Sequence, residues 1–259
     1  MNRRHARDLA PEREAKLRAL LQQQRVVRVE DLCRELGVSA ATVRRDLDRL
    51  EQAGELQRVH GGAIAGESRL AEPLFEDKAS VALAQKRRIA LKALEQVEQD
   101  ACIYLDGGST VLELARLLHD HSRLTVTTNS LRVASDLAGV GPRLIVVGGE
   151  LRRLSQTFVG TLTGALLERL HVDTAFMGTI GLSVEAGLTT TDPREAHTKG
   201  LVMSRARRVV VLADSSKVGK VSFACSGALS QVDCVITDRG IGRKAADVFR
   251  KQGVEVIAV

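Results

Sequence analysis

The sequence predicts an α/β protein in two parts: an N-terminal helix-turn-helix with a wing, then a domain built on a mostly parallel β-sheet. Two observations carry this prediction. Between Val29 and Ala63, two short segments with narrow apolar faces flank a glycine turn, a pattern typical of a helix-turn-helix. From about residue 82 onward, short apolar runs alternate with amphipathic stretches, as in parallel strands joined by helices.

The two N-terminal segments have apolar residues at helical spacing: Val29, Leu32 and Leu36 in the first, and Val43, Leu47 and Leu50 in the second. Gly37-Val38-Ser39 separates them. The Ser39 side chain can accept a hydrogen bond from a free N–H of the following turn, so Ser39 is a good N-cap. We therefore predict a second helix over Ser39–Ala53.

The exposed face of this second helix carries threonine and arginine. Arg45 lies about 200° from Val43 at 100° per residue, on the opposite side of the helix. Thr42 and Arg49 are three and four residues from Arg45 and share its face, with Arg44 on the flank. Arginine binds guanine edges or phosphates, so this face has the chemistry that a major groove requires. The alternative is an ordinary solvated surface helix.

A short strand pair is expected after Gly54, formed by Glu55–His60 and closed by the turn at Gly61-Gly62. Such a wing would bring Arg58 and His60 near a DNA backbone or minor groove. The residues that we predict to contact DNA are Ser39, Ala40, Thr42, Arg44, Arg45, Arg49, Arg58 and His60.

Composition agrees with a polyanionic partner without requiring one. The chain has 259 residues, 44% of them hydrophobic, a net charge of +6 and a pI near 9.4. The first 64 residues hold thirteen Arg/Lys and ten acidic residues, so the placement of the charges matters more than their excess. The absence of Trp and the single Tyr leave little material for stacking single-stranded bases. Duplex DNA is the favoured partner.

Several classes of protein are disfavoured. The four cysteines form no CxxC pair, which favours small buried residues in a reducing compartment over a disulfide or metal framework. His119 and His121 lack a second pair of ligands, so a solvated helix end is expected there and no metal site. No apolar run approaches membrane-spanning length and the N-terminus lacks an apolar signal region, so we expect a cytoplasmic protein with no membrane contact. No cofactor is predicted.

The domain boundaries follow from the change in pattern. We expect the DNA-binding part over 9–64, a linker over 65–80 and the α/β domain over 81–259. The expected strands are Ala101–Leu105, Leu124–Thr128, Leu144–Val147, Thr174–Ile180, Val209–Ala213, Cys234–Thr237 and Val254–Val259. The expected helices are Ala82–Gln96, Ser109–His119, Ser130–Ala138, Gly164–Leu170, Arg194–Arg205 and Ile241–Gln252.

Three loops at successive strand ends are rich in small polar residues and glycine. They are Asp106–Thr110, Thr127–Ser130 and Gly148–Arg153. Glycine lets a backbone approach a ligand, and free N–H groups at a helix start favour an anion. One such loop is an ordinary turn and cap, but three together predict a pocket for an anionic small molecule. Neither GxxxxGK[ST] nor GxGxxG occurs.

Two later segments have simpler interpretations. Glu195 and Lys199 are spaced i,i+4, which by itself favours a surface ion pair worth about 0.2–0.5 kcal/mol. Asp214–Lys217 follows an apolar strand and could be an ordinary turn.

The segment from Arg13 through VSAATVRRDL to LQRVHGGA resembles the helix-turn-helix and wing of the DeoR/GlpR family of bacterial repressors. The second half resembles the sensor domain of the same family. The matching motifs are DGGSTVLELARLL, TTNSL, GGELRR, DTAFMGTIGL, GLTTTDPREAHTK and LADSSKVGKVSF. The resemblance covers about Arg13 to Val259 and leaves the residues before Arg13 unmatched.

The resemblance implies a sensor domain related in fold to ribose-5-phosphate isomerase and the CoA-transferase group. It also implies a phosphorylated sugar or related metabolite as effector. The effector-site residues that it implies are Asp106, Gly108, Ser109, Thr110, Asn129, Ser130, Gly148, Gly149, Arg152, Lys199 and Lys217.

The expected function is repression of a sugar-utilisation operon by an operator-bound homo-oligomer, a dimer or a tetramer, that the phosphorylated sugar releases. One alternative is an isomerase-like enzyme beside a DNA-binding head, although no fixed nucleophile and base are evident. Another is a repressor that has lost ligand control. Pentose, hexose, amino-sugar and glycerol phosphates all stay open as effectors, as do the operator sequence and the choice between repressor and activator.

Overall fold

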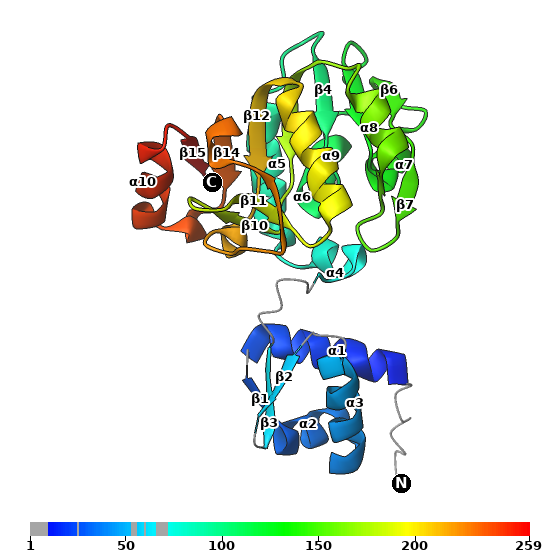
Figure 1. Cartoon of the computed structure of the whole chain (residues 1–259), viewed down its shortest axis with the longest axis vertical. Helices are drawn as coiled ribbons and strands as arrows, with labels where there is room; N and C mark the ends of the chain where they lie inside the picture. Colours follow the sequence, from blue (N-terminus) through cyan, green and yellow to red (C-terminus); the bar gives the residue numbers. More distant parts are fainter. Residues whose placement is uncertain (1–9, 25, 53–55, 60, 66–71) are drawn as a thin grey trace. The chain divides into compact units, whose positions relative to one another are not determined.

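The computed structural model describes residues 10–24, 26–52, 56–59, 61–65 and 72–259. Contacts divide the chain into two compact units, Met1–Ala71 and Glu72–Val259 (Figure 1). Each unit buries its own apolar side chains, so each is described separately.

The described part of the first unit combines helices with a small antiparallel sheet. The helices are α1 (Ala10–Gln24), α2 (Val29–Leu36) and α3 (Ala40–Gln52), and the strands, in sheet order, are β1 (Val26–Arg28), β3 (Gly62–Ala65) and β2 (Leu56–Val59). Leu17 of α1, Leu32 of α2 and Val43 and Leu47 of α3 are at most 1% exposed and pack together. The predicted helix-turn-helix with a wing is confirmed.

Local chemistry explains the turn between α2 and α3. Gly37 ends α2 with a φ of 64°, a left-handed conformation that suits glycine. The Ser39 Oγ then accepts a hydrogen bond from the Thr42 N–H at 3.3 Å, as expected of an N-cap. In the wing, β2 pairs with β3 in the register Arg58 to Ala63. Ala53, Glu55 and His60, which also belong to the predicted elements, lie outside the described residues.

The second unit is organised by a seven-stranded sheet whose strand pairs are all parallel. In sheet order the strands are β15 (Glu255–Ala258), β14 (Cys234–Thr237), β12 (Ala206–Leu212), β9 (Val172–Met177), β4 (Cys102–Leu105), β5 (Thr125–Thr128) and β6 (Arg143–Val146). Each coincides with a predicted strand to within a few residues. The prediction of a parallel α/β domain is therefore confirmed.

Helices cover both faces of this sheet and make three layers. Along each central strand successive side chains alternate between the faces: Ile103 and Leu105 of β4 pack in one apolar cluster, Tyr104 in the other. Helices α5 (Leu83–Leu94), α6 (Ser109–Arg116) and α7 (Leu131–Leu137) contribute to the first cluster. Helices α8 (Thr161–Leu167), α9 (Pro193–Ser204) and α10 (Arg243–Lys251) contribute to the second. In Figure 1, α9 lies in front of the sheet and α5 behind it.

Two smaller antiparallel sheets were not predicted. One pairs β7 (Glu150–Arg152) with β8 (Thr157–Val159), and the other joins β10 (Gly181–Ser183), β11 (Gly187–Thr190) and β13 (Ala224–Gly227). These strands are three or four residues long, and β10, β11 and β13 are rich in Gly, Ser and Thr, so their sequences are typical of loops. They extend the segments that leave the carboxyl ends of the main sheet.

The expected linker over 65–80 is shorter on its C-terminal side than predicted. Residues 72–80 belong to the second unit and include the helix α4 (Phe75–Ser80). Phe75 is 4% exposed and packs in the cluster formed with α5, α6 and α7, which is why this charged segment is part of the unit. Residues 66–71 lie outside the description.

The expectation of buried cysteines holds for Cys234 but is wrong for Cys102 and Cys225, which are exposed. Cys102 begins β4 at the amino edge of the sheet, where an apolar run does not ensure burial. His119 is also exposed, with its Nε2 2.8 Å from Asp136 Oδ2, and no set of metal-ligating side chains occurs among the described residues.

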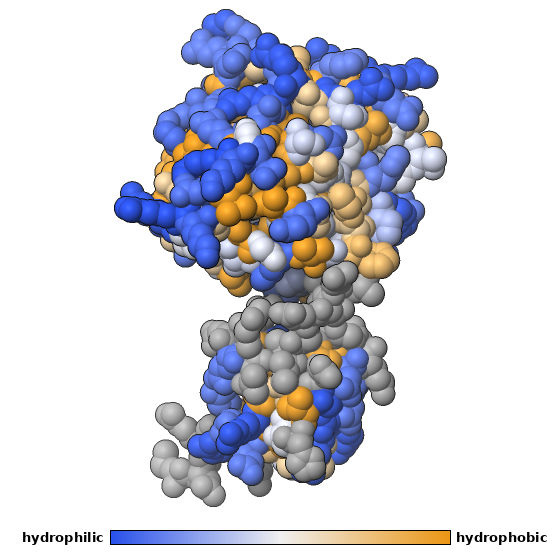
Figure 2. Space-filling view, turned by 60° about the vertical axis from the view of Figure 1, so that its left-hand side comes forward, coloured by the Kyte–Doolittle hydropathy of each residue, from blue (hydrophilic) through white to orange (hydrophobic). Residues whose placement is uncertain are grey.

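The surface of the second unit is mixed. Figure 2 shows polar side chains over much of one side, with an apolar patch among them. Leu91, Leu162 and Phe223 are apolar residues more than half exposed. None of the helices described is long and apolar enough to span a membrane.

Candidate DNA-contacting surface and anion-binding site

The outer face of α3 presents two arginines. Arg44 and Arg45 are exposed, and no described residue forms an ion pair with either guanidinium. Thr42 lies one turn earlier, with its Oγ1 3.0 Å from the Ser39 Oγ, and Ala40 begins the helix. Four of the predicted DNA-contacting residues thus gather at the N-terminal half of α3, where a helix entering a groove reaches base edges.

Arg49 is oriented differently from Arg45. Its Nη1 lies 3.0 Å from Glu14 Oε1 of α1. Beside it, Arg13 donates to both oxygens of Asp46, from Nε at 2.5 Å and from Nη2 at 3.2 Å, and Asp46 is 1% exposed. A charged pair buried to this degree fixes α3 against α1. The sequence predicted that Arg49 shares a helix face with Arg45. In the structure the Arg49 guanidinium instead contacts the Glu14 carboxylate of α1.

Arg58 on the wing holds the wing to α3. Its guanidinium donates to Asp48 and, at 3.3 Å, to the Arg44 carbonyl, and its backbone N–H donates to Glu51 Oε1 at 2.8 Å. This arginine therefore already has acceptors within the unit, whereas no described residue pairs with Arg44 or Arg45. The other wing residue in the prediction, His60, lies outside the described residues.

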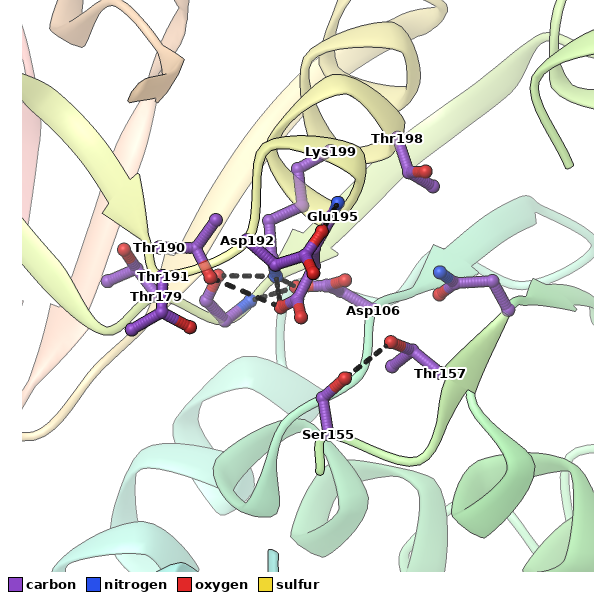
Figure 3. Close-up of polar contacts among 12 residues, drawn as sticks. Asp106, Ser155, Thr157, Thr179, Thr190, Thr191, Asp192, Glu195, Thr198 and Lys199 are labelled. Atoms are coloured by element: carbon purple, nitrogen blue, oxygen red, sulfur yellow. Dashed lines mark hydrogen bonds and ion pairs between the residues drawn. The ribbon is translucent and has the colours of Figure 1, made fainter. Parts of the chain in front are cut away.

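In the second unit, polar residues converge at the carboxyl ends of β4 and β9. Asp106 directly follows β4 and is 2% exposed. Its Oδ2 accepts from the Gly178 N–H, just after β9, at 2.9 Å, and from the Lys199 ammonium. Lys199 also donates to the Gly178 carbonyl at 3.1 Å. Figure 3 shows Lys199 and Glu195 reaching from α9 toward Asp106.

Glu195 and Lys199 are not a surface pair, so that interpretation is wrong. Both are 4% exposed, and Lys199 Nζ lies 3.8 Å from Glu195 Oε1. Burial raises the pKa of Glu195, against the lowering effect of Lys199 and Arg152. Burial by itself lowers the pKa of Lys199, but the charges of Asp106 and Glu195 outweigh it and raise that pKa. Lys199 is therefore a protonated, buried cation.

Arg152 of β7 joins three carboxylates to this group. It contacts Glu72 Oε2 at 2.7 Å, Asp192 Oδ2 at 3.2 Å and Glu195 Oε2 at 3.2 Å, and it also donates to Thr191 Oγ1 at 3.2 Å. Its side chain is 11% exposed. The resemblance implied that Arg152 binds the effector, and here carboxylates of the chain surround it.

A second group of cations lies around the start of α6. The Lys78 carbonyl links Lys86 to the start of α6, because it accepts from Ser109 Oγ at 3.4 Å and from the Lys86 ammonium, which also donates to the Val81 carbonyl at 2.7 Å. The charge of Lys217 acts on Lys86. Burial lowers the pKa of Lys86 to about 8, although nearby Asp214 opposes the shift. Burial also lowers the pKa of Lys217, and the charges of Asp214, Lys220, Lys78 and Glu72 act on it as well.

Lys217 differs from its neighbours in having no acceptor. No hydrogen bond or ion pair of its ammonium with any described residue occurs, whereas Lys78 pairs with Glu72 and Lys86 with carbonyls. The first N–H groups of α6 also lack partners within the helix. Partly buried lysines beside a helix start make a local surplus of donors, which suits an anion.

Other predicted residues serve the fold directly. The Asn129 side chain accepts from the Tyr104 hydroxyl at 2.7 Å and donates to the Phe158 carbonyl at 2.8 Å. Ser130 caps α7, and Thr110 is 7% exposed inside α6. Thr163 donates to the Gly148 carbonyl at 2.9 Å. Gly108 lies just before α6, with Gly178 beside it.

Gly149 has a packing role. A Cβ at this position would lie 2.0 Å from Thr163 Oγ1 and 2.9 Å from the Val159 carbonyl, so no other residue fits without displacing them. Packing alone therefore explains why residue 149 is a glycine, independently of any ligand.

Sequence reasoning missed Glu72, Lys78 and Lys86. All three are charged residues in a stretch read as linker or amphipathic helix, and no spacing motif marks them. What marks these charged residues as functional candidates is their burial, since Lys86 is 3% exposed and the Glu72 side chain 1% exposed. Burial is a property of the folded chain and cannot be read from the sequence. Asp214 was noted as part of a turn, and it proves to be 6% exposed beside Lys86.

A separate hollow of about 450 Å³ lies at the opposite edge of the sheet, at the amino ends of β4, β9 and β12. Cys102, His171, Asp173 and Arg205 are among the residues that line it. None of them belongs to the two polar groups described above.

Comparison with known proteins places both units. A model of the DeoR-like helix-turn-helix domain matches residues 13–69, and a model of the DeoR C-terminal sensor domain matches residues 81–239. The chain is 36% identical to a putative aga operon transcriptional repressor of Escherichia coli O157:H7, over 96% of this chain and 93% of that one. It is 33% identical to the glycerol-3-phosphate regulon repressor of Escherichia coli K12, over 85% and 87%.

Among solved structures, a D-ribose-5-phosphate isomerase in complex with phospho-erythronic acid is similar with a TM-score of 0.38 and 19% identity. The similar region covers 52% of this chain and 54% of the isomerase chain. The family models cover the helix-turn-helix and the parallel sheet as far as residue 239, and the aga operon relative matches 96% of this chain. The chain belongs to the DeoR family of helix-turn-helix transcriptional regulators.

Proposed function

We propose that this chain is a transcriptional repressor that binds duplex operator DNA through α3 and is released by a phosphorylated sugar bound in its second unit. The observation that carries the proposal is the group of buried or half-buried cations beside the start of α6, close to the buried Asp106–Lys199 pair. The cations beside α6 suit a phosphate, and the Asp106–Lys199 pair suits the hydroxyl groups of a sugar. The names of relatives, repressors of an aga operon and of a glycerol-3-phosphate regulon, support it.

On the DNA side, Arg45 and Arg44 are proposed to read bases or phosphates in the major groove. Their exposure and their lack of ion pairs within the described unit support this role. Ser39, Ala40 and Thr42 would approach the same groove from the first turn. Arg58 and His60 of the wing, together with Arg49, complete the proposed contact set.

On the effector side, the phosphate is proposed to bind Lys217 and the first N–H groups of α6, with Ser109 and Thr110 beside them. Lys217 carries a charge without an acceptor among the described residues, which an anion would supply. Asp106, Lys199 and the polar ends of β5 and β9 would then face the hydroxyl groups of the sugar.

The switch follows from linkage. The effector must bind the released arrangement more tightly than the DNA-bound one, because equal binding would change nothing. A homo-oligomer is proposed because a symmetric assembly matches repeated half-sites in an operator. The exposed apolar residues of the second unit are available for such contacts.

Sensing is proposed rather than catalysis. A base that abstracts a proton needs a free lone pair, whereas Lys199 is held as a cation between Asp106 and Glu195. Glu195, whose pKa is raised by burial, is the residue that favours the alternative of an isomerase. Incubation with pentose and hexose phosphates, followed by NMR, separates the two: turnover would support the enzyme, and unchanged substrate the sensor.

A thermal-shift screen tests the effector class. The full-length protein is heated with pentose, hexose, amino-sugar and glycerol phosphates and with the corresponding unphosphorylated compounds. A ligand that binds the folded state at 100 times its Kd adds about 2.7 kcal/mol to the free energy of unfolding. We expect stabilisation by at least one phosphorylated compound and by none of the unphosphorylated ones. No shift with any phosphate would remove the proposed effector class.

A further inference from the structure

Glu72 is a carboxylate buried among donors that come from elsewhere in the second unit. Its side chain is 1% exposed. Lys78 Nζ lies 2.8 Å from one oxygen, and Arg152 Nη2 lies 2.7 Å from the other, which also accepts from the Thr191 hydroxyl. An ammonium, a guanidinium and a hydroxyl around one anion make the donor set that binds phosphate groups in proteins.

The other carboxylates near Arg152 are built into the elements that carry them. Asp192 accepts from the N–H groups of Arg194 and Glu195 and so caps α9. Glu195 lies within α9 itself. Glu72, by contrast, precedes α4 and is the first residue of the second unit. The Glu72 side chain contacts Arg152 and Thr191, which lie far from it in the sequence.

The backbone next to Glu72 has few other attachments. Leu74 is 53% exposed, and its carbonyl accepts from the Lys78 N–H inside α4. The anchors of α4 begin one residue later: Phe75 is buried, and Glu76 pairs with Arg132 and accepts from Gln156 at 2.9 Å. Within the described part of the chain, the polar contacts that join residues 72–74 to the unit beyond α4 are those of the Glu72 carboxylate with Arg152 and Thr191.

We propose that Glu72 is an internal ligand of the effector site, and that the anionic group of the effector displaces its carboxylate from Arg152, Lys78 and Thr191. The inference rests on the proposed function and extends its phosphate site to Arg152 and Thr191, because Lys78, which pairs with Glu72, also acts electrostatically on Lys217. Opposite charges hold Glu72 ionised there: burial alone would raise its pKa, but Lys78 and the hydrogen bonds from Arg152, Lys78 and Thr191 lower it. An incoming phosphate offers the same donors more charge and more acceptor oxygens.

Displacement has a consequence for regulation. Residue 72 is where the chain from the DNA-binding unit enters the second unit. When the carboxylate leaves its donors, residues 72–74 lose these polar contacts, and the chain segment that leads to the first unit is held less tightly. Effector binding and DNA binding are then coupled through one side chain, and by linkage the coupling acts in both directions.

Three full-length variants test the displacement with inorganic phosphate as the probe in calorimetric titrations. Glu72→Gln removes the competing charge, and we expect phosphate to bind about tenfold tighter than to the unaltered protein. Glu72→Asp keeps the charge but shortens the side chain, and we expect phosphate to bind about threefold tighter. Net charge cannot explain this gain, because the substitution does not change it. Glu76→Gln is the matched control, with the same charge change on α4 outside the site, and we expect no gain.

Hydrogen exchange of residues 72–80 in the unaltered protein gives an independent measurement that needs no variant to fold. Displacement predicts faster exchange of the Lys78 amide, whose N–H donates to the Leu74 carbonyl at 3.0 Å, when phosphate saturates the protein. Slower or unchanged exchange would mean that the carboxylate stays in place, and would overturn the proposal.

The remaining outcomes separate the two proposals. Binding by the Glu72 variants alone would mean that phosphate cannot displace the native carboxylate, and would overturn displacement. Equal affinity in the unaltered protein, Glu72→Gln and Glu76→Gln overturns displacement but leaves the effector site standing. If phosphate binds to none of the proteins, the effector site itself is refuted, and displacement with it.

Discussion

The Arg13–Asp46 pair should dominate the stability of the first unit. Asp46→Asn preserves the volume of the side chain but removes the negative charge that the Arg13 guanidinium, whose side chain is 11% exposed, contacts at 2.5 Å. Removing one partner of a buried pair costs about 3–5 kcal/mol. Because the amide oxygen still accepts one bond from Arg13, we expect a loss near the lower end, about 3 kcal/mol of the free energy of unfolding.

Hydrogen exchange of the α3 amides in the full-length protein measures this loss separately from the second unit. A loss of about 3 kcal/mol corresponds to exchange faster by roughly 100-fold. Glu14→Gln is the control, because it neutralises the carboxylate that lies 3.0 Å from Arg49, whose side chain is 55% exposed, and such pairs contribute up to about 1 kcal/mol. Equal effects of the two substitutions would refute the argument that burial makes Asp46 the anchor of α3.

Three further predictions follow from the two sites. Arg45→Ala should weaken operator binding by about 1–3 kcal/mol if Arg45 reads a base, and an unchanged gel-shift titration would exclude it from the contacts. Lys217→Ala should leave DNA affinity intact and blunt release by a sugar phosphate; exposed Lys220→Ala is the control, and release at the normal effector concentration in Lys217→Ala would contradict the assignment. Lys86 has a pKa of about 8 in the folded chain, below its ordinary value of 10.5, so the unfolded chain binds more protons between these values. The free energy of unfolding should therefore rise from pH 8 to pH 10.5, and denaturant titrations of Lys86→Met should lack this contribution; an identical rise in both proteins would assign it elsewhere.

The parallel sheet was predictable because its strands are continuous apolar runs separated by helical stretches. Strands buried on both faces, such as Val209–Leu212 of β12, have this pattern whatever their order in the sheet. The order itself was not predictable, since β9 lies between β4 and β12 through contacts far apart in the sequence. The short strands β7, β8 and β10 depend on pairing rather than on their own composition.

The candidate sites were predictable where a residue acts through its local position. Ser39 caps α3 as its sequence context indicates, and Asp106 follows β4 at the carboxyl edge of the sheet. Tertiary contacts decided the rest. Glu195 and Lys199 look like a surface pair by spacing, but the packing of α9 over the strand ends buries both. Glu72 gave no signal at all, because its donors come from residues 78, 152 and 191.

The central claim is that one chain couples a phosphorylated sugar to operator binding. Its most direct test is a titration of the full-length protein with an operator duplex, recovered by selection from random sequences, with and without each sugar phosphate that stabilises the protein. The account predicts that at least one of them lowers operator affinity by about 5–150-fold, and that its unphosphorylated counterpart does not. Operator affinity that is unchanged by every stabilising sugar phosphate would contradict it.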